Sequence, residues 1–167
     1  WFLVFGFWFL GLCLAGCASG TKRPAPAQNP ENILDELTDF EGQPFKPDRK
    51  EVKLQIIEFW VSWCVPCREA LPAMDQLYRQ YKHQGLGVLA VSVDENPEEA
   101  MGFVAQIRPQ FEVAWDPYGD VQTTFGVGTL PTTVILDATG ELLVRLTGYT
   151  TENHQMIRHQ VKLLLEP

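Results

Sequence analysis

The stretch Trp63-Cys64-Val65-Pro66-Cys67-Arg68 comes directly after the apolar run from Leu54 to Trp60. A short, continuous apolar run of this kind is typical of a strand that is covered on both faces. Apolar residues at helical spacing from Ala70 to Tyr81 predict a helix that begins near Cys64. Two residues between the thiols place both sulfurs in the first helical turn, within reach of each other for a disulfide bond. The sequence therefore predicts a redox-active dithiol where a buried strand meets a helix.

The two cysteines are expected to have different tasks. A helix N-terminus stabilises a thiolate because its unpaired amide groups point at the sulfur. We therefore expect Cys64 to be the nucleophile that attacks a disulfide of a partner protein. Cys67 lies one turn into the helix, where we expect it to be more covered and to resolve the mixed disulfide. The other cysteines, Cys13 and Cys17, precede the expected domain, so this pair has no structural bridge beside it.

Further expected strands and helices alternate along the chain. A short element over Ile33 to Phe40 and a turn at Gly42 precede the first strand; Pro72 should bend the first helix and Gly85 should end it. The later segments are a strand over Gly87 to Val93, a helix from Pro97 to about Ile107, a strand over Phe111 to Trp115, a helical turn over Gly119 to Phe125, a hairpin of Thr132 to Leu136 with Glu141 to Leu146, and a helix from about Thr151. This order predicts an α/β fold with a mixed sheet flanked by helices.

Length, composition and charge limit the classes of protein. A chain of 167 residues with 46% hydrophobic residues can bury one core, so we expect a single folded domain over residues 32–167. The formal net charge of -8 argues against nucleic acid as a partner, because binding a polyanion depends on clustered Lys and Arg.

The N-terminal segment predicts export. Residues 1–16 are uncharged and apolar, which is typical of a signal peptide; the starting Met and a basic n-region are missing, so we expect this signal to be truncated at its start. Leu14-Ala15-Gly16-Cys17 resembles the bacterial lipobox, whose cysteine carries lipid and becomes the first residue after cleavage. Residues 17–31 would then be the lipid-bearing cysteine and a flexible linker. An uncleaved transmembrane anchor is the alternative.

Glu58 is a carboxylate inside the apolar run Ile56-Ile57-Glu58-Phe59-Trp60. If it is buried, its pKa should rise, and a neutral carboxyl beneath the dithiol could take the proton from Cys67 and return it later. The alternative is that this strand position faces outward or pairs with a Lys, since charged groups are seldom fully buried.

Pro131 follows Leu130 just ahead of an expected strand. A cis peptide here would form a tight turn and expose the backbone of Leu130 to an incoming peptide. A trans proline at the first residue of a strand is the simpler interpretation, and the residues alone favour it.

Several segments together resemble the thioredoxin superfamily, specifically the membrane-tethered TlpA/ResA-like thiol-disulfide reductases. They are Phe59 to Arg68 followed by Pro72, Val91-Ser92-Val93-Asp94, Trp115-Asp116-Pro117, Phe125-Gly126-Val127, Leu130-Pro131-Thr132 and Leu136-Asp137-Ala138-Thr139-Gly140. The resemblance implies a thioredoxin fold with an extra strand and helix before the hairpin, a cis bond at Leu130-Pro131, and the family's roles for Cys64, Cys67 and Pro131. An acid often stands three places after the second cysteine in this group; here that place is Ala70, and Glu58 stands in the strand instead.

The resemblance also implies partners and a location. By analogy, electrons arrive from a membrane thiol donor and leave to disulfides of exported proteins such as apo-cytochrome c or copper-site proteins. We expect the substrate to contact Trp63, Pro66, Leu130 and Pro131, with Trp63 rather than Trp60 as the exposed tryptophan. The protein would be a monomer, lipid-anchored at the extracytoplasmic face of a bacterial membrane.

Other functions for a pair of cysteines fit less well. We expect no cofactor and no metal, since structural zinc takes four ligands, no second cysteine pair is present, and His83, His154 and His159 are scattered and expected to be solvated. The alternative function is a Sco-like copper-binding module on the same fold, although that resemblance would need a wider cysteine spacing. A peroxidase fits less well still. The acidic run from Asp94 to Glu99 is interpreted as a solvated helix start.

Overall fold

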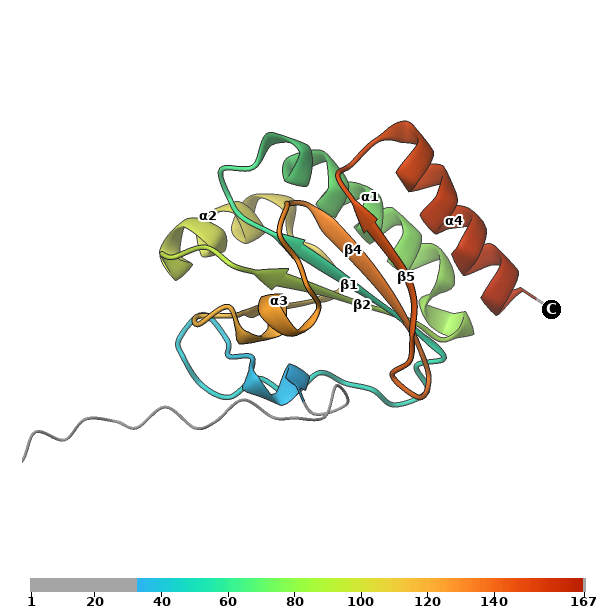
Figure 1. Ribbon diagram of the computed structural model, residues 1–167, viewed down its shortest axis with the longest axis horizontal. Helices are drawn as coiled ribbons and strands as arrows, with labels where there is room; N and C mark the ends of the chain where they lie inside the picture. Colours follow the sequence, from blue (N-terminus) through green and yellow to red (C-terminus); the bar gives the residue numbers. More distant parts are fainter. Residues whose placement is uncertain (1–32, 167) are drawn as a thin grey trace, which may run out of the picture.

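The computed structural model describes residues 33–166 (Figure 1). The expected signal peptide over residues 1–16, the lipidation of Cys17 and the linker up to residue 31 lie outside the described residues. Within residues 33–166, no helix is long and apolar enough to cross a bilayer.

A five-stranded mixed sheet forms the centre of the domain, in the order β3-β2-β1-β4-β5. The strands are β1 (Leu54–Trp60), β2 (Leu86–Ser92), β3 (Glu112–Trp115), β4 (Thr132–Asp137) and β5 (Leu142–Thr147). Strands β1, β2 and β3 are parallel to one another, whereas β4 is antiparallel to both β1 and β5. The predicted α/β class with a mixed sheet is confirmed, including the extra strand between the first βαβ unit and the hairpin.

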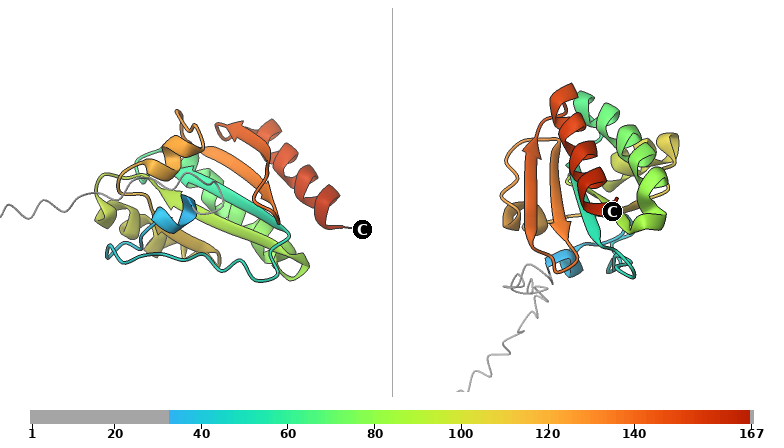
Figure 2. Two further views of the ribbon diagram at one scale, coloured as in Figure 1. Left: turned by 60° about the horizontal axis from the view of Figure 1, so that its bottom comes forward. Right: turned by 90° about the vertical axis from the view of Figure 1, so that its right-hand side faces the viewer.

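Helices cover both faces of this sheet (Figures 1 and 2). The helices are α1 (Val65–Tyr81), α2 (Pro97–Ile107), α3 (Asp120–Thr124) and α4 (Thr151–Leu165), with 3-10 turns η1 (Ile33–Glu36) and η2 (Lys82–Gln84). Buried side chains of α1, α2 and α4 form one core on one face of the sheet, and η1 packs with α3 over the other. All seven residues of β1 and of β2 are buried, as their continuous apolar runs predict.

Most helix starts have a capping side chain. Asn96 accepts a hydrogen bond from the Glu98 amide ahead of α2, and Thr150 accepts one from Asn153 ahead of α4. The end of α1 differs from the prediction, because the α-helix stops at Tyr81 and tightens into η2 before Gly85 turns the chain at φ 106°.

The sheet brings three separate segments to one edge. Parallel strands β1 and β2 both end there, and β4 begins there, because Phe59 of β1 pairs with Thr132 of β4 and Trp60 pairs with Ser92 of β2. The loop that carries the dithiol, the segment after β2 and the turn before β4 are therefore neighbours.

Candidate active site

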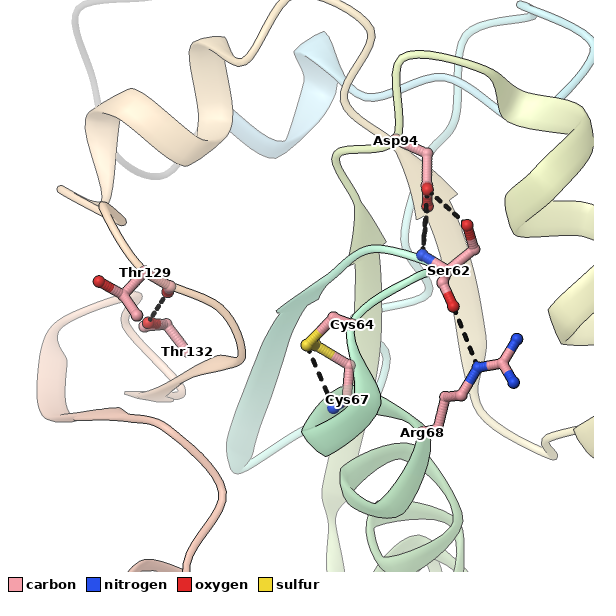
Figure 3. The surroundings of a disulfide bond; sticks show 7 residues. All are labelled: Ser62, Cys64, Cys67, Arg68, Asp94, Thr129 and Thr132. Atoms are coloured by element: carbon pink, nitrogen blue, oxygen red, sulfur yellow. Dashed lines mark hydrogen bonds between the residues drawn. A yellow bond between two sulfur atoms is a disulfide. The ribbon is translucent and has the colours of Figure 1, made fainter.

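Cys64 and Cys67 form a disulfide at the N-terminus of α1, with the sulfurs 2.08 Å apart (Figure 3). Cys64 is the N-cap residue of the helix, and its sulfur accepts a hydrogen bond from the Cys67 amide at 3.2 Å. In the reduced protein the same amide would face a Cys64 thiolate, which is the electrostatic setting that favours the charged form of a thiol.

The two cysteines differ in their access to solvent. Cys67 is completely buried, whereas Cys64 retains 7% exposure and lies between two exposed residues, Trp63 and Val65. Trp63 is 73% exposed and Trp60 is fully buried, which confirms the predicted choice between the two tryptophans. Pro66 is exposed as well. Of the two cysteines, Cys64 is therefore the more accessible to an incoming disulfide.

The peptide bond between Leu130 and Pro131 is cis, as the family resemblance implies. The trans bond that the residues alone favour is wrong. Pro131 is buried and its carbonyl accepts a hydrogen bond from the Gly148 amide at 2.7 Å, whereas Leu130 is half-buried. This turn immediately precedes β4, and Figure 3 shows its flanking residues Thr129 and Thr132 at the edge of the sheet that carries the disulfide.

Glu58 is buried, with 1% of its surface exposed, so the outward-facing and Lys-paired alternatives are wrong. It lies on the same face of β1 as Ile56 and Trp60, and both of these belong to the core cluster that includes Cys67. The Thr133 hydroxyl donates a hydrogen bond to Glu58 Oε2 at 2.6 Å, and Oε1 has no hydrogen-bond partner. Burial raises the pKa of Glu58 to about 7, and the bond from Thr133 offsets part of this rise.

Tyr149 lies close enough to Glu58 for the carboxylate charge to affect the pKa of its phenol. Burial raises the pKa of the Tyr149 phenol, and the negative charges of Glu69 and Glu58 raise it further. Its ring contacts the ring of His154, with centroids 5.7 Å apart. His154 is half-buried and its Nδ1 is a buried atom without a hydrogen-bond partner, so the expectation that this histidine is solvated is wrong.

Asp94 does not belong to a solvated acidic run, which corrects the interpretation of the sequence. The exposed acids Glu95, Glu98 and Glu99 fit that description, but Asp94 is only 3% exposed. Its carboxylate accepts hydrogen bonds from the Ser62 amide and hydroxyl and from the Ser92 hydroxyl, at 2.8 to 3.0 Å. The sequence does contain one signal for its burial, because Asp94 stands only two residues after the end of the buried strand β2.

Among residues 33–166, no group of three or more His, Cys, Asp or Glu side chains lies close enough together to hold a metal ion.

A Cys-X-X-Cys pair at the start of a helix, beside a cis proline and on a sheet of this topology, defines a thioredoxin-like thiol-disulfide oxidoreductase. The model of the AhpC/TSA family matches residues 31–145, and the chain belongs to this family. Among the relatives that it resembles are the ResA proteins. It is 34% identical over 116 residues to the thiol-disulfide oxidoreductase ResA of Bacillus thuringiensis subsp. konkukian, which covers 70% of this chain and 67% of the relative.

Further relatives agree with this assignment. ResA of Halalkalibacterium halodurans is 32% identical over 128 residues, or 77% of this chain and 72% of the relative. A crystal structure from Chlorobium tepidum, described as a thiol:disulfide interchange protein DsbE, is similar with a TM-score of 0.67 and 34% identity. That similarity covers 71% of this chain and 83% of the other. The protein is thus an enzyme of thiol-disulfide exchange, and its substrates are proteins that carry disulfides.

Proposed function

We propose that this enzyme reduces disulfides of exported proteins, using Cys64 as the nucleophile and Cys67 as the resolving cysteine. The observation that carries the proposal is the difference between the two cysteines: Cys64 caps α1 and retains 7% exposure, whereas Cys67 is fully buried. Apo-cytochrome c and copper-site proteins are the client classes that the family resemblance suggests.

The cycle begins with the reduced pair. The Cys64 thiolate attacks one sulfur of the client disulfide, forms a mixed disulfide and displaces the other client sulfur as a thiolate, which takes up a proton. Cys67 then loses its proton and attacks Cys64, which closes the Cys64–Cys67 disulfide and releases the second client thiol. The client gains two electrons and two protons, and a membrane-bound dithiol donor must return two electrons to the enzyme for the next cycle.

Glu58 serves the second half of this cycle. A buried carboxyl with a pKa of about 7 exchanges a proton at neutral pH, and its unpaired Oε1 has room for one. We assign Glu58 the task of accepting the proton from Cys67 as Cys67 attacks, and of returning a proton when the pair is reduced again.

The client polypeptide contacts the surface around Cys64. Trp63 and Pro66 are exposed apolar residues close to Cys64 in the chain, and the Leu130-Pro131 turn lies at the same edge of the sheet. An extended client segment in this position would find apolar contacts from the side chains and hydrogen-bonding groups from the backbone of Leu130.

The proposed cellular location rests on the expected signal peptide and on the resemblance of Leu14-Ala15-Gly16-Cys17 to the lipobox. We propose that residues 1–16 are removed, that lipid on Cys17 holds a monomeric enzyme at the extracytoplasmic face of the membrane, and that residues 17–31 act as a spacer. Intact mass of membrane-extracted protein tests this: an unmodified chain that retains residues 1–16 would contradict lipidation.

A trapping experiment tests the exchange mechanism. In a Cys67→Ser variant the mixed disulfide cannot be resolved, so client proteins should accumulate covalently on Cys64 in the native cell envelope and be released by a reductant. A Cys64→Ser, Cys67→Ser double variant is the matched control and should trap nothing. Failure of the single variant to capture any client would overturn the proposed mechanism.

The reduction potential tests the direction of electron flow. Val65-Pro66 supplies no charged or imidazole group to stabilise the thiolate strongly, so we expect a reductant rather than an oxidant. Equilibration with thiol redox buffers should give a potential well below that of dedicated periplasmic oxidants, which lies at about -120 mV. A value near -120 mV would mean that the enzyme oxidises its clients.

A further inference from the structure

Asp94 links the segment after β2 to the loop that follows β1. It stands two residues after β2, and three donor groups point at its two carboxylate oxygens. Two of these donors, the amide and the hydroxyl, belong to Ser62, which lies 32 positions away in the loop between β1 and Cys64. The third is the Ser92 hydroxyl. The backbone carbonyl of Asp94 in turn accepts a hydrogen bond from Trp115 Nε1 at 2.8 Å, which links the segment to β3.

Ser62 is held from its other side by α1. Arg68 Nε donates a hydrogen bond to the Ser62 carbonyl at 3.1 Å, and the Arg68 guanidinium lies over the Phe103 ring of α2 at 5.2 Å from its centroid. Figure 3 shows Asp94 and Arg68 on opposite sides of Ser62, with the disulfide beside them. The residue two places before Cys64 therefore has both its amide and its carbonyl fixed by charged side chains.

We propose that Asp94, acting through Ser62 and together with Arg68, is a positioning residue that aims Cys64 at the amide groups of the first turn of α1. The proposal rests on dithiol exchange at Cys64 and Cys67. Ser62 is 7% exposed, so its amide needs an acceptor within the protein, and Asp94 provides it. The Cys64 amide donates a hydrogen bond to the Val61 carbonyl at 3.2 Å and so closes a turn around Ser62. With Ser62 fixed, this turn sets where the Cys64 sulfur lies relative to the Cys67 amide.

Positioning and simple charge predict opposite effects when Asp94 is neutralised. A negative carboxylate near a thiol disfavours the thiolate, so removal of its charge alone would lower the pKa of Cys64. Loss of the fixed loop would instead move the sulfur away from the helix amides and raise that pKa. The sign of the change therefore separates the two explanations.

The experiment compares the full chain with its Asp94→Asn variant in the reduced state. The ultraviolet absorbance of the thiolate, followed against pH, should show the Cys64 pKa raised by about one unit, which is tenfold less thiolate at a pH below that pKa. The rate of attack on a small disulfide at that pH should fall about threefold, because a more basic thiolate partly offsets its lower population. A lowered or unchanged pKa in the Asp94→Asn variant would overturn the proposal.

Two further variants keep the test interpretable. Arg68→Lys retains the positive charge but loses the planar Nε donor to Ser62, so it should raise the Cys64 pKa in the same direction even if Asp94→Asn does not fold; no change in Arg68→Lys would count against the proposal. Glu95→Gln removes an exposed negative charge beside Asp94 and leaves the hydrogen bonds to Ser62 in place, so it should leave the Cys64 pKa within about 0.2 unit of the wild-type value. If the Cys64→Ser, Cys67→Ser control exchanges disulfides as well as the wild type does, the underlying mechanism fails, not the positioning role alone.

Discussion

Glu58 and Asp94 are two acids buried at neighbouring strands, and they differ in the number of hydrogen-bond donors that surround them. Glu58 receives one hydrogen bond, from Thr133, and one of its oxygens is unpaired. Asp94 receives hydrogen bonds at both oxygens from three donor groups. A buried carboxyl with few donors is easily protonated and can carry a proton, whereas one with many donors holds its neighbours in place. This difference underlies the two roles that we propose, Glu58 as a proton carrier and Asp94 as a positioning residue.

The largest expected effect is the loss of stability in an Asp94→Asn variant. The new amide nitrogen would face donors that now share the carboxylate, and buried donors without an acceptor cost about 1–3 kcal/mol each. We expect the free energy of unfolding to fall by about 4 kcal/mol in denaturant titrations of the oxidised protein. A loss below about 1 kcal/mol would mean that the bonds to Ser62 and Ser92 matter little, and the contrast with Glu58 would disappear.

The isosteric change Glu58→Gln is expected to raise the free energy of unfolding at neutral and higher pH, the opposite of the effect of Asp94→Asn. The folded-state pKa of Glu58 lies above its unfolded value, at about 7 against 4.5, so the native protein binds the extra proton and its stability falls as pH rises between these values. This difference corresponds to about 3 kcal/mol. Unfolding titrations from pH 4 to 8 should show the decline in the wild type and a smaller decline in Glu58→Gln. Parallel curves for the two proteins would show that Glu58 does not titrate in this range.

The Glu58→Gln variant is also expected to resolve the mixed disulfide more slowly. Loss of a proton carrier should slow the attack of Cys67 on the mixed disulfide by about 100-fold, the lower end of what general acid–base catalysis contributes. Formation of the mixed disulfide by Cys64 should change little. Stopped-flow measurements with a disulfide peptide separate the two steps, and equal slowing of both would remove Glu58 from the mechanism.

The smallest effect is expected when Glu58 loses its single hydrogen-bond donor, Thr133. Thr133→Val removes the hydroxyl that lowers the pKa of Glu58, a hydrogen bond with a net contribution of about 1 kcal/mol. The pH range over which stability declines should therefore extend upward by less than about one pH unit. Titration of the Glu58 carboxyl by NMR measures this directly, and a downward movement would show that Thr133 favours the neutral form.

The dithiol and the strand before it could be predicted from sequence because their signals are local. The apolar run from Leu54 to Trp60 defines a buried strand, and two residues between Cys64 and Cys67 suffice to place both at a helix start. Burial of Glu58 could not be settled in this way, since a single charged residue in a strand is compatible with either face.

Two of the errors in prediction concern residues with hydrogen-bond partners that are distant in the chain. Asp94 is buried and accepts hydrogen bonds from Ser62, 32 positions away, and no pattern within the acidic run from Asp94 to Glu99 distinguishes it from its neighbours. The cis bond at Pro131 belongs to a turn whose carbonyl is bound by Gly148, from the segment after β5. Only the resemblance to known proteins anticipated that bond, because the residues alone favour the trans form.

Strand β1 occupies the middle of the sheet, and both strands that flank it contribute to the site: β2 leads to Asp94, and β4 follows Pro131. The outermost strands, β3 and β5, are one strand further from the dithiol. The turn between β4 and β5 lies at the end of β4 that is far from Pro131, so it can lengthen, shorten or change composition without altering the distances among the reacting groups. Evolution can diversify that end of the domain while the sulfur chemistry at the other end stays the same.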